Sequence, residues 1–323
     1  MSKLNMFKKM NNLKIVFMGT PEFAVESLDA LISNNYVIKA VVTAPDKKSG
    51  RGNKINFSDV KKYSIKNKLR LLQPENLKEK NFIDQLKLIN ADIFIVVAFR
   101  MLPKEVWKIP NKGTINLHAS LLPQLRGAAP IHWAIINGLK KTGLTTFFIN
   151  EKIDFGNIIE QSEVEIRDFE NTGNLYERLK KIGSILIIST IKLISKDKFQ
   201  IIKQTNSENL IKAPKLNKEN TRINWNESGE KIYNMIRGLS PYPSAWTISE
   251  KKDKVLKIHK VIYKKESRSP KLKGVISIKK NLMKVYVKDG YLEVLELQIA
   301  GKKRMSATEF ANGYNDYDST KLL

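Results

Sequence analysis

The middle of the chain's N-terminal half reads ADIFIVVA (residues 91–98), an almost uninterrupted apolar run of strand length. A strand with one face in water alternates apolar and polar side chains, whereas this run presents apolar side chains on both faces. Parallel strands covered by helices on both sides have this composition. The run therefore predicts a central strand in a mostly parallel, helix-covered sheet.

Strand and helix patterns alternate on both sides of this run. Strands are predicted over residues 13–19, 37–43, 114–118 and 145–149, and helices over residues 21–33, 81–89, 129–137 and 172–195. This alternation indicates a doubly wound, Rossmann-like α/β domain. Beyond residue 241 come short β-like runs, with a hairpin signal at Asp289-Gly290. These runs predict a small β-barrel of OB type.

Composition excludes several classes of protein. The 323 residues suffice for two domains, and no apolar run approaches the roughly 20 residues of a membrane-spanning helix. The absence of cysteine excludes disulfides, thiolate metal sites and cysteine nucleophiles. We therefore expect a cytoplasmic protein without a membrane contact.

The chain is strongly basic, with a net charge of +25. A polyanionic partner is one interpretation. The other is a lysine-rich composition from an A/T-rich genome, because only 10 of the 57 basic residues are arginine. Residues 251–280 hold twelve basic and two acidic residues, which predicts a local basic face in the second domain.

One predicted strand carries polar residues at its carboxyl end. The sequence there is INLHASLLP (residues 115–123), followed by RGAAP (residues 126–130). Strand side chains two residues apart share a face, so Asn116 and His118 are expected to project together. An amide donates hydrogen bonds and an imidazole titrates near neutrality. This pair suits the attack of an amine on a carbonyl group.

Asp154 is expected at the same edge of the sheet. It stands in IDFG (residues 153–156), a loop that follows another predicted strand. Loops at the carboxyl ends of strands in an open α/β sheet converge on the ligand crevice. We expect Asp154 to orient His118, while His118 and Asn116 stabilise a developing tetrahedral oxygen.

Other kinds of site do not fit the motifs. The sequence GTP at residues 19–21 lacks the glycines of a dinucleotide loop. Ser120 does not stand in a G-x-S-x-G elbow, which argues against a serine hydrolase. With no cysteine and no H-E-x-x-H motif, no zinc site is expected.

A basic loop, PDKKSGRGNK (residues 45–54), follows the second predicted strand. Between two glycines, the backbone at Arg51 can approach phosphates closely. We interpret this loop as a nucleic-acid contact, and a solvated surface loop is the alternative.

Together these residues resemble the folate-dependent formyltransferase superfamily, whose members share an Asn, a His and an Asp in the active site. The core of the resemblance is residues 116–123, residues 126–130 and Asp154. It extends over nearly the whole chain, to residues 14–23, 50–52, 223–225, 241–246 and 300–306. The core specifies the superfamily, and the basic loop and the C-terminal segments are similar to members that act on tRNA.

The resemblance implies transfer of the formyl group of 10-formyltetrahydrofolate to the amino group of methionine on initiator tRNA, without a metal. Three residues become the catalytic trio: Asn116, His118 and Asp154. Four become the folate-contacting segment: Ser120, Leu121, Leu122 and Pro123. Four become tRNA contacts of the basic loop: Lys47, Lys48, Arg51 and Lys54. The expected parts of a monomer are a disordered basic leader (1–12), a formyltransferase domain (13–202), a linker (203–220) and an OB-like tRNA-contacting domain (221–323).

Four positions depart from the family pattern: Arg100, Gln124, Leu125 and Asn157. They affect the expected details of the folate pocket and leave the trio intact. Two alternatives stay open, a formyltransferase that acts on an amino sugar nucleotide and a non-catalytic RNA-binding protein.

Overall fold

The computed structural model describes residues 13–49, 54–205, 209–266, 272–279 and 282–323. The basic leader and Arg51 lie outside these residues. Contacts divide the chain into two compact units. The first unit comprises Met1–Gly127, Gly143–Val164 and Tyr176–Ile211, and the second comprises Ala128–Thr142, Glu165–Leu175 and Lys212–Leu323. Residues 128–142 and 165–175, which lie inside the predicted first domain, thus group with the second unit.

The first unit is built on a seven-stranded sheet with the order β10-β9-β7-β6-β1-β2-β5. The parallel strands are β1 (Lys14–Gly19), β2 (Val37–Val42), β5 (Leu71–Leu72), β6 (Ile93–Val97) and β7 (Thr114–His118). Strand β9 (Lys141–Phe148) runs antiparallel to β7, and β10 (Ile158–Glu165) forms the edge. The sheet is therefore mostly parallel, which confirms the predicted fold class.

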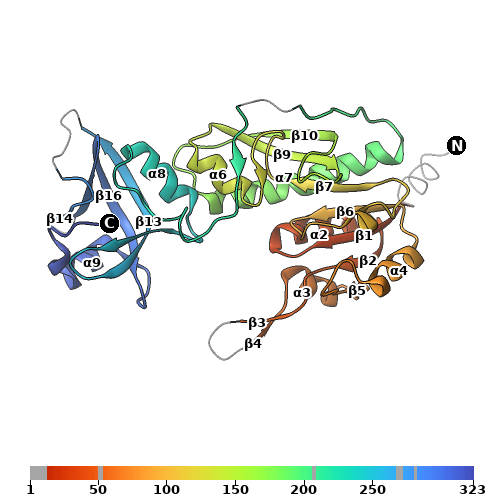
Figure 1. The fold of residues 1–323 in the computed structure, drawn as a ribbon, viewed down its shortest axis with the longest axis horizontal. Coiled ribbons are helices and arrows are strands. Elements are labelled where there is room, and N and C mark those ends of the chain that lie inside the picture. The colour runs from red at the N-terminus through yellow and green to blue at the C-terminus, as the bar shows by residue number, and fades with distance from the viewer. Residues whose placement is uncertain (1–12, 50–53, 206–208, 267–271, 280–281) are drawn as a thin grey trace. The chain divides into compact units, whose positions relative to one another are not determined.

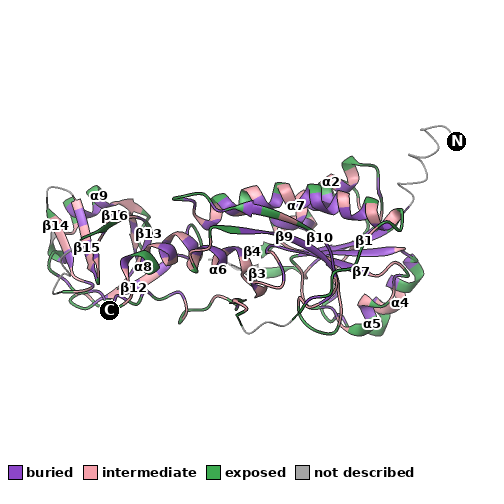
Figure 2. Cartoon of the chain, turned by 90° about the horizontal axis from the view of Figure 1, so that it is seen from above, coloured by how far each residue is buried: buried purple, intermediate pink, exposed green. Residues whose placement is uncertain are grey.

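Helices and short strands complete this unit. The helices are α2 (Glu22–Ser33), α3 (Asp59–Lys66), α4 (Lys80–Ile89), α5 (Lys104–Trp107) and most of α7 (Thr172–Ser195). Figure 1 shows α2, α3, α4 and α7, and Figure 2 shows α5. The short strands are β3 (Lys47–Ser49), β4 (Lys54–Asn56) and β8 (Arg126–Gly127). None of the described helices combines the length and the apolar character needed to cross a membrane.

The apolar run at residues 91–98 contains β6. All five of its residues are buried, and it lies between β1 and β7 (Figure 1). Figure 2 shows the strands of this sheet mostly in the colour of buried residues. Phe94 and Ile95 point to opposite faces of the sheet, and both are fully buried. The strand is thus covered on both faces, as its composition predicts.

The order of the strands locates the ligand crevice. From β1 the chain proceeds outward through β2 and β5, and it then returns to β6 and β7 on the other side of β1. In an open α/β sheet, ligands bind outside the carboxyl ends of the strands where the order reverses. The carboxyl ends of β1 and β6, with β7 beside them, define this edge.

The second unit contains an antiparallel sheet of order β12-β13-β16-β15-β14, with β17 paired to β16. Its strands are β12 (Ala245–Ser249), β13 (Lys254–Lys265), β14 (Ile276–Lys279), β15 (Leu282–Val287), β16 (Gly290–Ile299) and β17 (Met305–Ser306). The remaining elements are α6 (Pro130–Ile136), β11 (Lys212–Ala213), α8 (Gly229–Gly238), α9 (Ala307–Gly313) and a 3₁₀ turn (Asn315–Tyr317).

The two edges of this sheet are joined by the last residues of the chain. Leu322 bridges Ser249 at the end of β12, and Lys321 bridges Val275 just before β14. A closed or nearly closed sheet leaves few backbone groups unpaired, as expected for a small barrel. Gly290 pairs with Val287, so Asp289 lies in the turn of the predicted hairpin.

Asp289 also stabilises the start of α8. Its carboxylate accepts a 2.6 Å hydrogen bond from the Gly229 N–H, in the first turn of that helix. Partial burial raises the pKa of Asp289, but the hydrogen bonds from Gly229 and Tyr263 outweigh it, so the pKa lies below its ordinary value. A carboxylate at a helix N-terminus contributes about 0.3–1 kcal/mol.

The change Asp289→Asn is expected to lower the free energy of unfolding by about 0.3–1 kcal/mol at pH 7. Because the folded-state pKa is depressed, the contribution of the charge is complete above the ordinary pKa of about 3.9. It is lost as the pH falls through the folded-state value. Thermal unfolding of both proteins at several pH values measures the difference. A difference that persists at the lowest pH would mean that the charge is not its cause.

Candidate active site

Strand β7 presents Asn116 and His118 at the carboxyl edge of the sheet. Both belong to the regular strand, and their spacing of two places them on one face. Asn116 is half-buried, whereas His118 is 7% exposed. The regular strand thus agrees with the common face predicted for these two side chains.

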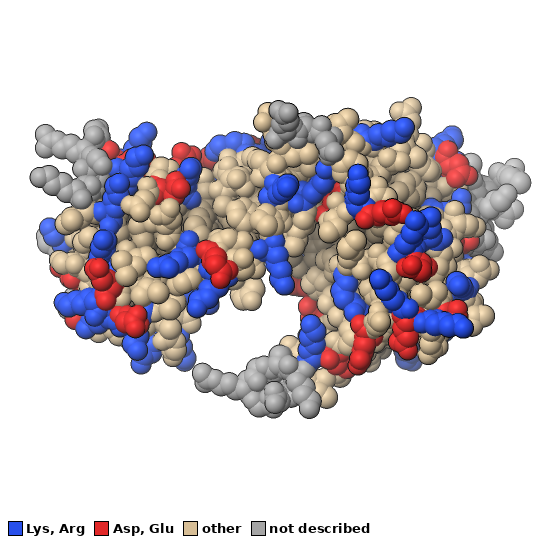
Figure 3. Space-filling view, in the orientation of Figure 1, with Lys and Arg blue, Asp and Glu red and all other residues tan. Residues whose placement is uncertain are grey.

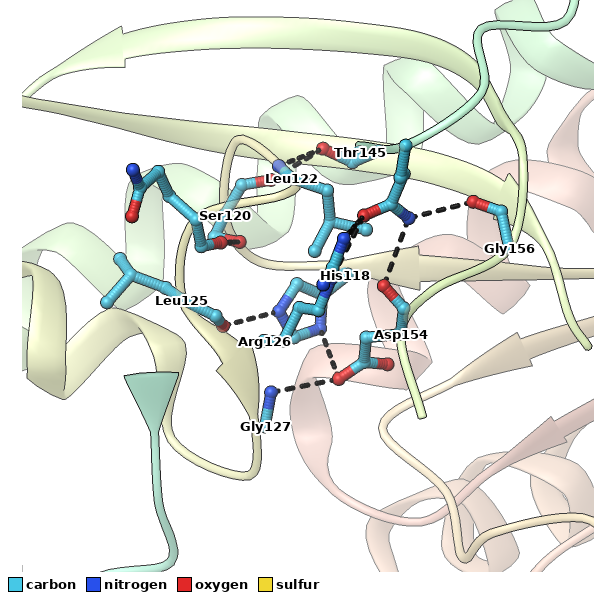
Figure 4. A network of polar contacts seen from close by, with 11 residues as sticks. His118, Ser120, Leu122, Leu125, Arg126, Gly127, Thr145, Asp154 and Gly156 are labelled. Atoms are coloured by element: carbon cyan, nitrogen blue, oxygen red, sulfur yellow. Dashed lines mark hydrogen bonds and ion pairs between the residues drawn. The ribbon is translucent and has the colours of Figure 1, made fainter. Parts of the chain in front are cut away.

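Asp154 lies against His118 (Figure 4). Its Oδ2 is 3.7 Å from His118 Nδ1, and the two side chains are 12% and 7% exposed, respectively. The other ring nitrogen, Nε2, is 2.9 Å from the carbonyl oxygen of Leu125. Both neighbours are hydrogen-bond acceptors, so a protonated ring can donate toward each of them. The Nδ1 to Oδ2 distance is longer than a hydrogen bond, so the pair is an ion-pair contact when the ring is protonated.

The loop that carries Asp154 has a specific backbone shape. Asp154 adopts a left-handed conformation with φ of 52°, which Asp tolerates better than most residues. Its Oδ2 accepts a 3.0 Å hydrogen bond from the Gly127 N–H. Gly156 follows where a Cβ would lie 1.5 Å from the carbonyl oxygen of Phe148. The loop therefore requires glycine at this position, and the carboxylate is directed between His118 and Gly127.

Hydrogen bonds fix the proposed folate-contacting segment, residues 120–123. The Ser120 hydroxyl donates to the carbonyl of Gln124 at 2.7 Å, and Ser120 is fully buried. Thr145 Oγ1 donates to the Ser120 carbonyl at 2.6 Å and accepts from the Leu122 N–H at 3.1 Å. Since its hydroxyl proton is used in this turn, Ser120 does not have the geometry of a serine-hydrolase nucleophile.

The departures from the family pattern have structural partners. Arg100 donates to the carbonyls of Pro74 and Glu75 at 2.7 and 2.9 Å. Gln124 Oε1 accepts from the backbone N–H of Ile211 at 2.9 Å. Leu125 is 1% exposed, and its backbone carbonyl contacts His118. The Gln124 side chain and the Leu125 backbone thus tie the loop that follows β7 to Ile211 and His118, and the Asn157 carbonyl accepts from the Phe148 N–H at 2.9 Å.

The predicted basic loop is in part a β-hairpin. Strand β3 pairs with β4, with Lys47 opposite Asn56 and Ser49 opposite Lys54, while the tip with Arg51 lies outside the described residues. Hydrogen bonds from Lys61 and Gln73 hold the pKa of Asp46, at the base of the hairpin, below its ordinary value. Of the lysines in this hairpin, Lys47 is exposed on the described part of the stem.

Positive charge is not confined to this hairpin. Figure 3 shows Lys and Arg side chains over both units, with Asp and Glu side chains between them on this face.

In the part of the chain that the structure describes, no group of three or more metal-ligating side chains is positioned to hold an ion.

Two contacts of the active-site loops are not predictable from the sequence. The Leu125 carbonyl is a backbone group, which has no sequence signature. Gln204, at the start of the predicted linker, hydrogen-bonds the loop of Asp154 from 50 residues away in the chain. Only its position in an otherwise irregular, polar stretch could have drawn attention to it.

The fold and the Asn–His–Asp grouping define a class of protein that comparisons identify. A family model described as formyl transferase matches residues 13–191, and one described as formyl transferase, C-terminal domain, matches residues 215–315. The chain therefore belongs to the formyl transferase family.

Within this family, similar curated proteins carry a more specific name. A methionyl-tRNA formyltransferase of Flavobacterium johnsoniae is 51% identical over 97% of this chain and 100% of its own length. One from Bacteroides fragilis is 44% identical over 97% of this chain and 99% of its own length.

Solved structures share the fold at low identity. An N-formyltransferase from Helicobacter canadensis, in complex with folinic acid and dTDP-3-aminofucose, has a TM-score of 0.63 at 21% identity and covers 91% of this chain and 100% of its own. HypX from Aquifex aeolicus with tetrahydrofolic acid has a TM-score of 0.62 at 16% identity, over 93% of this chain and 47% of its own.

Proposed function

We propose that this protein transfers the formyl group of 10-formyltetrahydrofolate to the amino group of methionyl-initiator tRNA, giving formylmethionyl-tRNA for translation initiation. The observation that carries the proposal is the grouping of Asn116, His118 and Asp154 at the carboxyl edge of the sheet. The names of relatives that are 44–51% identical over nearly the full chain support the same substrate. We further propose that the protein works as a cytoplasmic monomer.

The residues present suit a folate donor. Residues 120–123 form a hydrogen-bonded turn directly after β7, with Leu121 half-buried at the surface of that turn. An apolar surface beside an amide, an imidazole and a carboxylate provides for both a flat ring and a reacting formyl group.

The geometry assigns a role to each member of the trio. The neutral amine attacks the formyl carbon, and the Asn116 amide and protonated His118 stabilise the oxygen of the tetrahedral intermediate. The bond from that carbon to the folate nitrogen then breaks, and the folate nitrogen takes a proton from His118. Asp154 accepts the proton that the attacking amine loses, through water, so that the protons balance.

Formylation of purified methionyl-initiator tRNA by the whole chain tests the proposal. We expect formylmethionyl-tRNA to form with 10-formyltetrahydrofolate and not without it. A dTDP-linked amino sugar, offered in parallel, tests the alternative substrate class. Formylation of the sugar without formylation of the tRNA would replace our proposal, and binding of RNA without any turnover would favour a non-catalytic protein.

The basic hairpin is the proposed tRNA contact within the first unit. Changing Lys47, Lys48 and Lys54 together to alanine should reduce the slope of log affinity against log salt concentration by about 2–3, since each phosphate contact contributes roughly 0.7–0.9. Binding of initiator tRNA at several salt concentrations measures this slope.

A matched control removes the same charge elsewhere in the first unit. Lys66, Lys68 and Lys196 are exposed and lie outside the hairpin. Their joint change to alanine should leave most of the slope intact. Equal losses from the two triple variants would attribute the binding to overall charge and not to the hairpin.

A further inference from the structure

The chain after α7 contacts two loops of the candidate active site. One is the loop after β7, residues 119–127, and the other is the loop that contains Asp154, residues 153–156. Its described residues 202–205 and 209–211, here called the strap, belong to the first unit. Ile202 begins the strap with an antiparallel bridge to Ile158 in β10, through hydrogen bonds of 2.9 and 3.0 Å. This bridge places the following residues beside the loop that contains Asp154.

Gln204 joins two of these loops through its side chain. The residue is 9% exposed. Its Nε2 donates to the carbonyls of Asp154 and Gly156, at 3.0 and 2.7 Å. Its Oε1 accepts from Nε and a terminal nitrogen of Arg126, at 3.1 and 2.7 Å. The neighbours fix the orientation of the amide, because the reverse orientation would oppose donors to donors and acceptors to acceptors.

The two loops that Gln204 joins meet at the Asp154 carboxylate. Arg126 stacks on the ring of Phe155, 4.3 Å from its centroid, and the next residue, Gly127, donates its N–H to Asp154 Oδ2. Figure 4 shows Arg126, Gly127, Asp154 and Gly156 around this junction. The Gln204 carboxamide therefore binds the backbone carbonyls on both sides of Phe155. It also binds the Arg126 guanidinium, which stacks on the Phe155 ring.

The other end of the strap is tied to the partner of His118. The Ile211 carbonyl accepts from the Leu125 N–H at 2.7 Å. The Leu125 carbonyl in turn contacts His118 Nε2 at 2.9 Å. The strap thus contacts the loops that hold both members of the His–Asp pair.

We propose that Gln204 is a positioning residue, which holds Asp154 in its left-handed conformation and directs its carboxylate toward His118 and Gly127. This inference rests on the proposed function and adds to it a residue outside the catalytic trio. Gln204 acts through Asp154 and is not assigned a contact with either substrate.

Two variants distinguish the hydrogen bonds that the Gln204 amide nitrogen donates from those that its oxygen accepts. Gln204→Leu removes all four hydrogen bonds. Gln204→Glu still accepts from Arg126, but its carboxylate cannot donate to the carbonyls of Asp154 and Gly156. If the carbonyl contacts position Asp154, both variants should lower kcat about 10- to 100-fold, because a misplacement of about 1 Å has effects of this size. The KM values for the folate donor and for tRNA should change less than about threefold, since no substrate contact is lost.

The control is Gln298→Leu, which removes a carboxamide that donates to the Lys302 carbonyl in the second unit. Its kcat should equal that of the unaltered protein. A Gln204→Glu variant with full kcat would overturn the proposal, because only the Arg126 contact would then matter. A loss of active protein without a change in kcat per folded molecule would also overturn it, since Gln204 would be merely structural.

A crystal structure of Gln204→Leu gives a readout that needs no tRNA. We expect Asp154 Oδ2 to move away from the Gly127 N–H, now 3.0 Å distant. An unmoved carboxylate contradicts the positioning role, whatever the substrate is. If the unaltered protein does not formylate methionyl-tRNA, the proposed function fails, while this displacement still decides the role of Gln204.

Discussion

The change Asn116→Ala is expected to slow formyl transfer about 100- to 1000-fold, with a smaller effect on the KM of either substrate. Removing a single oxyanion donor costs roughly 3–4 kcal/mol in other enzymes that form a tetrahedral intermediate. Asn116 is half-buried on β7, and no other described group hydrogen-bonds to its carboxamide. Its two N–H donors are therefore available to an oxygen that gains charge in the transition state. Steady-state formylation of methionyl-initiator tRNA measures the effect.

The same substitution at Asn67 serves as the control. Asn67 also lies in the first unit, at the end of α3, where its amide donates to the Tyr63 carbonyl at 3.0 Å. Asn67→Ala should keep the full rate. If Asn116→Ala retained more than about a tenth of the rate, a backbone group or His118 alone would stabilise the developing oxygen, and Asn116 would not be catalytic.

Elements with a strong local pattern are predictable from this sequence. The apolar run at residues 91–98 contains β6, and α7 spans Thr172–Ser195 as its helical spacing indicates. Strand β10 and helix α8 were not predicted. Strand β10 lies at the edge of the sheet, and five of its eight residues are glutamate, glutamine or serine; α8 begins and ends with glycine. In such segments, contacts distant in sequence decide the structure, and propensity is a weak guide.

The site was predictable where it depends on the geometry of one strand. The spacing of two between Asn116 and His118 determines their common face. The approach of Asp154 to His118 was predictable from the general rule that loops at the carboxyl ends of strands in an open α/β sheet line the ligand crevice. The Leu125 carbonyl and Gln204 were not predictable, because they contact the site through tertiary structure. Gln204 stands in a stretch that looks like a linker, and only the path of the strap brings it to Asp154.

The change Gly156→Ala is expected to abolish most of the activity and to destabilise the first unit by about 3 kcal/mol or more, at the upper end of the range for overpacking. The added Cβ would lie 1.5 Å from the Phe148 carbonyl oxygen, which is backbone and cannot rotate away. The chain would have to separate residues 154–156 from β9. That movement would displace Asp154 and remove the contact of Gln204 with the Gly156 carbonyl. Thermal unfolding and the formylation rate measure the two effects.

Two comparisons separate crowding from other effects of the methyl group. Gly313 ends α9, and a Cβ there meets nothing within 4 Å, so Gly313→Ala should leave both measurements unchanged. The rate of Gly156→Ala should also fall further than its folded fraction does, because the loop carries Asp154, the residue proposed to orient His118. A variant that lost activity only in proportion to its unfolded fraction would mean that the catalytic geometry tolerates a displaced loop. In that case the reaction would not depend on the position of Asp154, even though its carboxylate lies 3.7 Å from His118.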